Sequence, residues 1–162
     1  MEPNIIIRPI EQKDSLAVAH LIRTVMTEFG AVGEGYSIMD PELEDMYTAY
    51  LPEHSLFLVI ESEGNILGCA GIAPLKGAAA HICELRKMYF YSELRGKGWG
   101  RKIMDACMTA AKERNYKQCY LETISSMATA RILYEKVGFK AIPSPIGNTG
   151  HSSCQLFYLL NL

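Results

Sequence analysis

The chain has 162 residues, of which 49% are hydrophobic and 21% are charged, and its formal net charge is −2. This length predicts a single domain, residues 1–162, with enough apolar side chains for one core. The nearly balanced charge argues against bulk binding to nucleic acid. No apolar run approaches the roughly 18 residues of a membrane helix, and the acidic start Met1-Glu2 is unlike a signal peptide, so we expect a cytoplasmic protein with no membrane partner.

The cysteine content gives a further constraint. Five cysteines, an odd number without any Cys-x-x-Cys pair, argue against a disulfide framework and against a zinc site. Several lie inside apolar runs, where cysteine behaves as a small hydrophobic side chain. We therefore expect free thiols in a reducing compartment and no metal.

In chain order, a β-branched run over residues 5–9 predicts a first strand. A helix follows, for which Asp14 is a suitable N-cap. Asp40-Pro41 is expected to start a second helix, because Asp is a favoured N-cap and Pro is favoured at the first helical position. Beyond it the pattern predicts strands over residues 55–61, 66–75, 81–91, 117–123, 139–142 and 154–160, and helices over residues 99–114 and 127–137.

These elements define a fold class. Glu63-Gly64-Asn65, between the second and third predicted strands, is a hairpin signal. Helices that alternate with strands, combined with antiparallel hairpins, predict an α/β protein built as a three-layer α/β/α sandwich around a mixed sheet.

The segment Arg95-Gly96-Lys97-Gly98-Trp99-Gly100 lies between a predicted strand and a long predicted helix. Glycines at alternate positions remove Cβ atoms where a ligand could approach the backbone, and amide groups at a helix N-terminus attract an anion. Basic residues at 95, 97, 101 and 102 add positive charge. The segment therefore predicts a pyrophosphate site.

Several interpretations compete for this site. A nucleoside-triphosphate loop is excluded because the required Lys-Ser/Thr pair is missing. A dinucleotide fingerprint fits poorly because Arg101 takes the third glycine position, although Glu122 lies about where a ribose-binding acid is expected. The acyl-CoA pyrophosphate pattern Arg/Gln-x-x-Gly-x-Gly/Ala is matched in full by Arg95, Gly98 and Gly100. The structural alternative is a surface turn before a helix.

Two stretches of the chain resemble motifs of the GNAT superfamily of acyl-CoA-dependent N-acyltransferases. The first runs from Cys83 to Gly100 (CELRKMYFYSELRGKGWG) and the second from Ala130 to Phe139 (ARILYEKVGF), in the family's order and separation. The resemblance implies the GNAT fold, in which a mixed, largely antiparallel sheet splays open between its fourth and fifth strands. It also implies acetyl-CoA as cosubstrate, bound in that cleft.

The cofactor contacts of the family carry over to the first motif. Backbone groups of Met88 and Phe90 are expected to bind the pantetheine arm by strand addition, and the amides of 95–101 are expected to hold the pyrophosphate. The residues expected to contact acetyl-CoA are Met88, Tyr89, Phe90, Arg95, Gly96, Lys97, Gly98, Trp99, Gly100 and Arg101. Many family members carry Asn where this chain has Met127, so one cofactor hydrogen bond is expected to be missing.

Acetyl transfer to an amine needs a base, donors for the oxyanion and an acid for the departing thiolate. Glu84 is the expected base, because burial in a strand raises a carboxyl pKa toward neutrality and several GNAT enzymes place a glutamate at this spacing. The structural alternative is a solvated position at which Glu84 pairs with Arg86 or Lys87. His81 and His151 are further base candidates.

Tyr134 is the expected acid. It stands in the second motif where many GNAT members aim a tyrosine at the CoA sulfur, and a phenol is a suitable donor to a developing thiolate. The alternative is packing, because the apolar positions 130, 133 and 137 form a helical stripe beside it.

The resemblance thus implies an N-acetyltransferase that works by direct transfer in a ternary complex. A primary amine of a small molecule is the expected acceptor, with a peptide amine as a less favoured one. The first two helices and the loop 143–150 are expected to form the acceptor wall, and the acidic N-terminal region favours a cationic amine. A non-catalytic acyl-CoA sensor is the alternative, a dinucleotide oxidoreductase is a more distant one, and the sequence leaves a homodimer open.

Overall fold

The computed structural model describes residues 3–162, so Met1 and Glu2, used above to argue against a signal peptide, lie outside the described residues. The strands are β1 (Ile5–Pro9), β2 (Leu56–Ser62), β3 (Asn65–Pro74), β4 (Ile82–Phe90), β5 (Gln118–Thr123), β6 (Lys140–Ile142) and β7 (Leu156–Asn161). The α-helices are α1 (Ser15–Glu28), α2 (Met46–Ala49), α3 (Trp99–Glu113) and α4 (Ala128–Val137). Within residues 3–162, no helix is long and apolar enough to cross a membrane.

The strands form one seven-stranded sheet in the order β1-β2-β3-β4-β5-β7-β6. Every neighbouring pair is antiparallel except β4 and β5, which are parallel. The predicted hairpin joins β2 to β3, and Glu63 and Gly64 both adopt a positive φ, as a two-residue primed turn requires. The mixed sheet predicted from the sequence is therefore confirmed.

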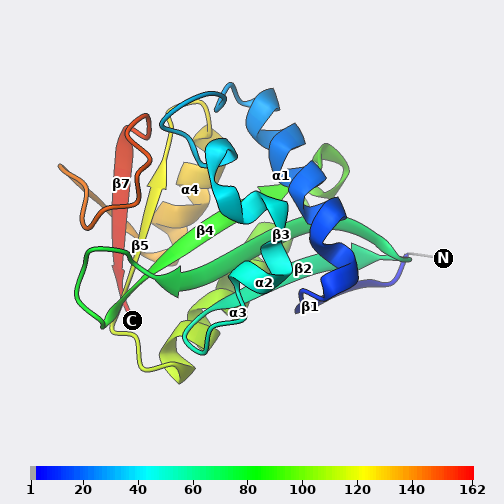
Figure 1. The fold of residues 1–162 in the computed structure, drawn as a ribbon, viewed down its shortest axis with the longest axis horizontal. Helices are drawn as coiled ribbons and strands as arrows, with labels where there is room; N and C mark the ends of the chain where they lie inside the picture. Colours follow the sequence, from blue (N-terminus) through cyan, green and yellow to red (C-terminus); the bar gives the residue numbers. More distant parts are fainter. Residues whose placement is uncertain (1–2) are drawn as a thin grey trace.

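Helices cover both faces of this sheet (Figure 1). Helices α1 and α2 lie on one face, and α3 and α4 lie on the other. Each face has its own apolar core: one is built around Val18, Ile22 and Phe57, and the other around Ile103, Cys107 and Leu121. The three-layer arrangement is thus confirmed, with a separate hydrophobic core on each face of the sheet.

A β-bulge interrupts β4. Two residues of β4, Lys87 and Met88, stand opposite the single residue Ala70 of β3, and Lys87 has a φ of 55°. An extra residue in one strand breaks the alternation of side chains between the faces. Arg86 and Lys87 therefore both point to the α1 face, while Met88 packs in the α3 face core.

The predicted boundaries of the strands and longer helices agree with the structure to within two residues, but two local predictions are wrong. Asp40-Pro41 starts a 3₁₀ turn (Pro41–Glu44) rather than an α-helix, and the Asp40 carboxylate makes no capping hydrogen bond. Asp14 precedes α1 but does not cap it, because its carboxylate accepts hydrogen bonds from Arg8 and from the amide of Glu11. In both cases the carboxylate pairs with a cation from another segment instead of capping the helix that was predicted to follow it.

Candidate active site

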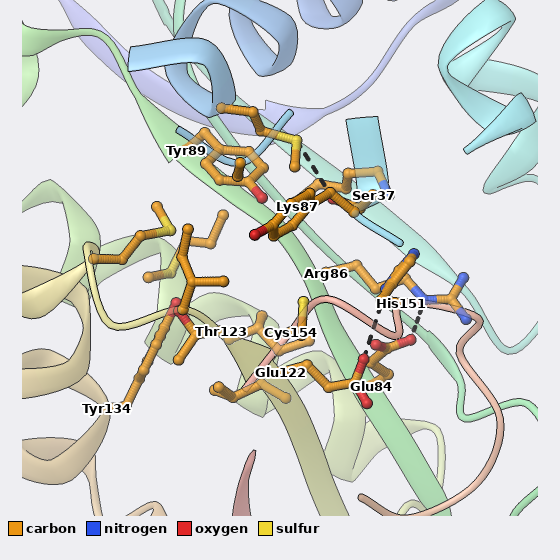
Figure 2. A pocket seen from close by; sticks show the side chains of 18 residues that line it. Ser37, Glu84, Arg86, Lys87, Tyr89, Glu122, Thr123, Tyr134, His151 and Cys154 are labelled. Carbon is orange, nitrogen blue, oxygen red and sulfur yellow. Dashed lines mark hydrogen bonds and ion pairs between the residues drawn. The ribbon is translucent and has the colours of Figure 1, made fainter. Parts of the chain in front are cut away.

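The site lies where β4 and β5 part. Their backbone pairing ends at Glu84 and Tyr120, and the strands diverge beyond that point. Two adjoining hollows occupy the gap: a groove of about 490 Å³ that reaches the glycine segment, and a pocket of about 60 Å³ (Figure 2). They share Met88, Tyr89 and Met127 as lining residues, so a ligand lying in the groove can extend one end into the pocket.

The glycine segment forms one end of the groove. Gly96 and Gly98 both have positive φ values, 74° and 85°, which non-glycine residues rarely adopt. Gly98 precedes the first residue of α3, and the amides of residues 96–101 have no backbone acceptor within the described residues. A row of free amide groups at the start of a 15-residue helix fits an anionic group such as a pyrophosphate.

Gly100 differs from the other two glycines in lying against α4. A Cβ atom placed on Gly100 would lie 2.9 Å from Cδ2 of Leu133 on α4, whereas one on Gly96 or Gly98 would meet no atom within 4 Å. A side chain at position 100 would therefore displace the end of Leu133 at the contact between α3 and α4. Gly100 also lines the groove, so its predicted contact with the ligand stays a prediction.

Most of the expected cofactor contacts line the groove. Nine of the ten do so: Met88, Tyr89, Phe90, Arg95, Gly96, Gly98, Trp99, Gly100 and Arg101. Lys97 is the exception, and its side chain is exposed to solvent.

Two of the basic side chains are bound to other protein groups. Arg95 donates to the carbonyl of Phe90 (2.9 Å) and pairs with Glu28 of α1, while Arg101 pairs with Asp105 one turn further along α3. Arg95 thus anchors the glycine segment to β4 and α1. The backbone amides, rather than the Arg95 guanidinium, are the free donors for a phosphate group.

Glu84 is buried, with 3% of its surface exposed, and lines the pocket. Its Oε1 accepts a hydrogen bond from Nε of Arg86 at 2.6 Å, so the predicted pairing with Arg86 and the predicted burial both occur. No partner binds Oε2 within the described residues, and this oxygen is not sealed from the pocket. Burial raises the pKa of Glu84 above its ordinary value, although Arg86 opposes the shift.

Glu122 is a second buried carboxylate in the same pocket, and its environment is opposite to that of Glu84. It accepts hydrogen bonds from the hydroxyl groups of Tyr120 (2.6 Å) and Thr149, and it lies 3.7 Å from Nδ1 of His151. Burial raises its pKa, but these three donors outweigh burial and lower it. Glu122 is therefore held as a carboxylate with little capacity to accept a proton.

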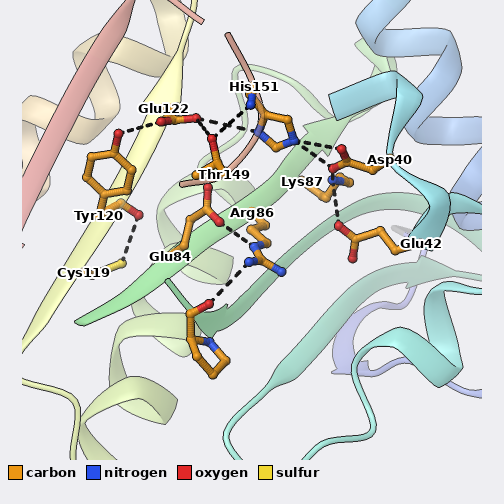
Figure 3. A network of polar contacts seen from close by, with 11 residues as sticks. Asp40, Glu42, Glu84, Arg86, Lys87, Cys119, Tyr120, Glu122, Thr149 and His151 are labelled. Atoms are coloured by element: carbon orange, nitrogen blue, oxygen red, sulfur yellow. Dashed lines mark hydrogen bonds and ion pairs between the residues drawn. The ribbon is translucent and has the colours of Figure 1, made fainter. Parts of the chain in front are cut away.

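An ion-pair network crosses the pocket from the C-terminal loop to the 3₁₀ turns (Figure 3). Nε2 of His151 lies 2.8 Å from Asp40, and Nζ of Lys87 binds both Asp40 (2.6 Å) and Glu42 (3.0 Å). Burial lowers the pKa of His151, but its bonds to Asp40 and Glu122 raise it to about 9. His151 is thus an imidazolium at neutral pH and a poor candidate for the base. His81, the other histidine candidate, is exposed and does not line the pocket.

Tyr134 lines the pocket from α4 and is 6% exposed. Its ring packs against Phe139 and Tyr158, with centroids about 6 Å apart, so the predicted helical packing occurs. Its hydroxyl group has no hydrogen-bond partner within residues 3–162 and is not sealed from the pocket. Burial raises the pKa of Tyr134 above its ordinary value of 10, so the hydroxyl carries a proton at neutral pH.

Ligand atoms of Glu84, Glu122 and His151 all lie within 4.8 Å of one another. Nε2 of His151 is bound to Asp40 and Nδ1 lies 3.7 Å from Glu122, so both ring nitrogens face carboxylates.

The sequence analysis did not identify the partners that organise this network. There, Asp40 and Glu42 count only toward the acidic character of the acceptor wall, Lys87 is only an alternative partner of Glu84, and Glu122 is only a ribose-binding acid. One signal was available: Lys87 and Glu122 are charged residues inside predicted strands of largely apolar character, and buried charges need partners.

Comparison with known proteins agrees with this architecture. The model of an acetyltransferase (GNAT) domain matches residues 53–141. An uncharacterized N-acetyltransferase of Escherichia coli K12, YjgM, is 40% identical over 158 residues, which cover 97% of this chain and 95% of that protein. A GNAT-family acetyltransferase of Staphylococcus aureus Mu50 has a similar structure, with a TM-score of 0.85, 24% identity and coverage of 98% and 99% of the two chains.

A further structural neighbour contains the cofactor. It is YncA of Salmonella typhimurium, solved with acetyl-CoA, with a TM-score of 0.77, 20% identity and coverage of 98% of this chain and 94% of that one. The splayed sheet, the glycine segment and these similarities define an acyltransferase. The chain belongs to the GNAT family of N-acetyltransferases.

Proposed function

We propose that this protein transfers the acetyl group of acetyl-CoA directly to a primary amine of a small molecule, within a ternary complex formed by the domain 1–162. One observation carries the proposal. The Glu84 carboxylate and the Tyr134 hydroxyl each keep a polar atom without a partner among residues 3–162, and both line one pocket at the end of the groove. A free base and a free acid beside one ligand path are what acyl transfer to an amine requires.

Acetyl-CoA binding is supported by the fit of the groove. The free amides of residues 96–101 suit the pyrophosphate, and the open edge of β4 beyond Glu84 offers backbone groups to the pantetheine arm. The carbonyl of Phe90 already accepts a hydrogen bond from Arg95, which leaves Met88 as the better placed of the two expected backbone contacts. YncA, which has this fold, was solved with acetyl-CoA.

Glu84 acts as the general base in this proposal. Its free Oε2 accepts a proton from the ammonium of the acceptor, directly or through one water molecule, and the neutral amine then attacks the thioester carbonyl. The raised pKa of Glu84 suits this task, because a carboxylate that is too acidic holds a proton poorly at neutral pH. Arg86 keeps the carboxylate oriented through its bond to Oε1.

Tyr134 donates its proton to the departing sulfur. The thiolate would otherwise form in a water-poor pocket where charge is costly. The hydroxyl is protonated at neutral pH, has no competing protein acceptor within the described residues, and is held by packing of its ring. As the C–S bond breaks, the nitrogen loses its second proton, which restores the Tyr134 hydroxyl, so the net reaction forms the amide and CoA thiol and leaves one proton on Glu84.

The acceptor is the least specified part. A pocket of about 60 Å³, with the Asp40–His151 contact across it, suits an amino group on a slender chain rather than a folded surface. The acidic residues that favoured a cationic acceptor are largely neutralised by this protein's own cations: Glu28 by Arg95, Glu44 by Arg23, and Asp40 and Glu42 by Lys87. Their excess charge therefore gives little support to a polycationic acceptor.

The test is a thiol-release assay with acetyl-CoA across a library of primary amines, with mass spectrometry of each product. We expect an amine-dependent release of CoA and an acetylated amine. The Glu84→Gln/Tyr134→Phe double variant is the control, since it should bind acetyl-CoA without turnover. If the wild-type protein binds acetyl-CoA tightly but acetylates no amine, the acyl-CoA sensor becomes the better interpretation.

A further inference from the structure

The pocket is lined by a buried hydroxyl group for which the described part of the chain offers no hydrogen-bond partner. Thr123 is the last residue of β5 and is 4% exposed, and its Oγ1 forms no hydrogen bond within residues 3–162. Its backbone carbonyl, by contrast, accepts from the amide of Gln155 at 3.2 Å. Buried polar atoms without partners are few in folded proteins, and each needs an explanation.

The position of Thr123 gives that explanation. It follows Glu122, beyond the point where β4 and β5 cease to pair, and it lines the pocket together with Tyr134. Its cross-strand neighbour Leu156 packs in the α3 face core, so Thr123 points to the α4 side of the sheet. Figure 2 shows Thr123 and Tyr134 at one end of the pocket, with His151 at the other.

The other two buried atoms without partners lie elsewhere. They belong to Tyr50 and Arg114, neither of which lines the groove or the pocket. Among the described residues, Thr123 is therefore the one residue lining either hollow that has a buried side-chain polar atom without a hydrogen-bond partner. A threonine hydroxyl can donate one hydrogen bond and accept others.

The path of the ligand determines which of its groups Thr123 meets. A ligand held by the amides of 96–101 must pass Met88 and Met127, which line both hollows, before it enters the pocket. The thioester is the end of acetyl-CoA farthest from its pyrophosphate, so it is the part of this ligand that would enter the pocket and meet Thr123. The polar atom of that end which needs a donor is the acyl carbonyl oxygen, and it gains negative charge as the amine attacks.

We propose that Thr123 Oγ1 donates a hydrogen bond to the acyl carbonyl oxygen of bound acetyl-CoA and so positions the thioester for attack. The inference rests on the proposed function, since it takes acetyl-CoA as the donor. Because CoA lacks the acyl group, the proposed contact with Thr123 exists for acetyl-CoA and not for CoA.

The test compares Thr123→Val, which keeps the shape and removes the hydroxyl, with Thr123→Ser, which keeps the hydroxyl. Calorimetry with acetyl-CoA and with CoA measures binding, and thermal unfolding measures stability. For Thr123→Val we expect affinity for acetyl-CoA and turnover to fall about tenfold each, affinity for CoA to change less than about twofold, and the unfolding midpoint not to fall. Thr123→Ser should restore most of both losses.

Three results would overturn the inference. Equal losses for CoA and acetyl-CoA would place the hydroxyl on the pantetheine arm, and unchanged binding and turnover would leave it without a ligand. A lowered unfolding midpoint with normal binding would make it a structural group. If wild-type protein fails to bind acetyl-CoA, the proposed function fails as well; if it binds acetyl-CoA but acetylates no amine, the binding comparison still decides the role of Thr123.

Discussion

Nε2 of His151 lies 2.8 Å from Oδ1 of Asp40, although 111 positions of the chain separate them. The contact joins the loop before β7 to the 3₁₀ turns before α2, on opposite sides of the pocket. Asp40 also binds Lys87 of β4, so one carboxylate connects three distant segments. The ionisation of His151 is therefore linked to the stability of the contact between these three segments.

This link predicts how stability depends on pH. The folded protein raises the pKa of His151 from 6.5 to about 9, so the stabilisation is complete below about pH 6.5 and is lost as the pH rises through 9. The shift corresponds to an upper value of about 3 kcal/mol. Urea unfolding from pH 6 to 9.5 should show this decline in the wild-type protein and a weaker one in His151→Gln. The exposed His81→Gln is the control and should behave as wild type.

Glu84→Gln is expected to lower turnover by roughly 10²-fold or more with little change in CoA affinity, because it removes the proton acceptor but keeps a hydrogen-bond acceptor for Arg86. In the wild-type protein, the apparent pKa of the acidic limb of the pH–rate profile should lie above the ordinary glutamate value of 4.5. In Glu84→Gln this limb should flatten. Steady-state kinetics from pH 5 to 9 measures both effects.

Glu122→Gln is the matched comparison for Glu84→Gln, since both carboxylates are buried in one pocket. Glu122 accepts hydrogen bonds from Tyr120 and Thr149. Its loss should lower the free energy of unfolding and leave the acidic limb in place. If Glu122→Gln removes the limb while Glu84→Gln keeps it, the assignment of the base is reversed.

Tyr134→Phe should reduce turnover by about 10–10³-fold and change stability little, because the hydroxyl has no protein partner to lose within the described residues. Tyr158→Phe is its control. The Tyr158 hydroxyl binds Arg131 and Glu135, so its removal should lower stability with normal turnover. Turnover and thermal unfolding of both variants give the answer, and normal turnover in Tyr134→Phe would make this tyrosine structural.

The two glycines at the start of α3 should respond differently to substitution. Gly98→Val places a β-branched residue at a φ of 85° in open space, so we expect CoA affinity to fall at least about tenfold with the fold retained. Gly100→Ala should instead act on stability and lower the free energy of unfolding by up to about 1 kcal/mol, because its Cβ meets Cδ2 of Leu133 at 2.9 Å and that side chain must shift.

Leu133→Ala tests the origin of the Gly100 effect. In the Gly100→Ala/Leu133→Ala double variant the two changes should cost less together than the sum of the separate costs, because the second removes the side chain that obstructs the first. Chemical denaturation of the four proteins measures this coupling. Strict additivity would show that the crowding at Leu133 is unimportant.

The fold was largely predictable because its signals are local. The β2–β3 hairpin follows from turn residues that tolerate positive φ, and α4 ends at Gly138, which adopts a φ of 114°. The positions of Glu84 and Tyr134 beside one pocket also followed from their motifs, although their chemical roles stay predictions.

The remaining features depend on tertiary contacts that no local pattern records. Asp40 satisfies the rule for a helix N-cap, yet Lys87 and His151 take its carboxylate, since two cations outweigh one amide donor. Gly100 resembles its neighbour Gly98 in sequence, but α4 packs against only one of them. Such assignments require knowing which distant segments meet.

The bulge in β4 adds a charged residue to the face of the sheet that α1 and α2 cover. Lys87 is the additional residue opposite Ala70. If Lys87 were absent, Arg86 and Met88 would be consecutive and would point to opposite faces of the sheet, as they do now. A chain one residue shorter at this point would retain every packed side chain of β4 and lose only the ammonium that binds Asp40 and Glu42. The insertion or deletion of this one residue can therefore make or remove the ion pairs to Asp40 and Glu42 without any substitution in the hydrophobic core.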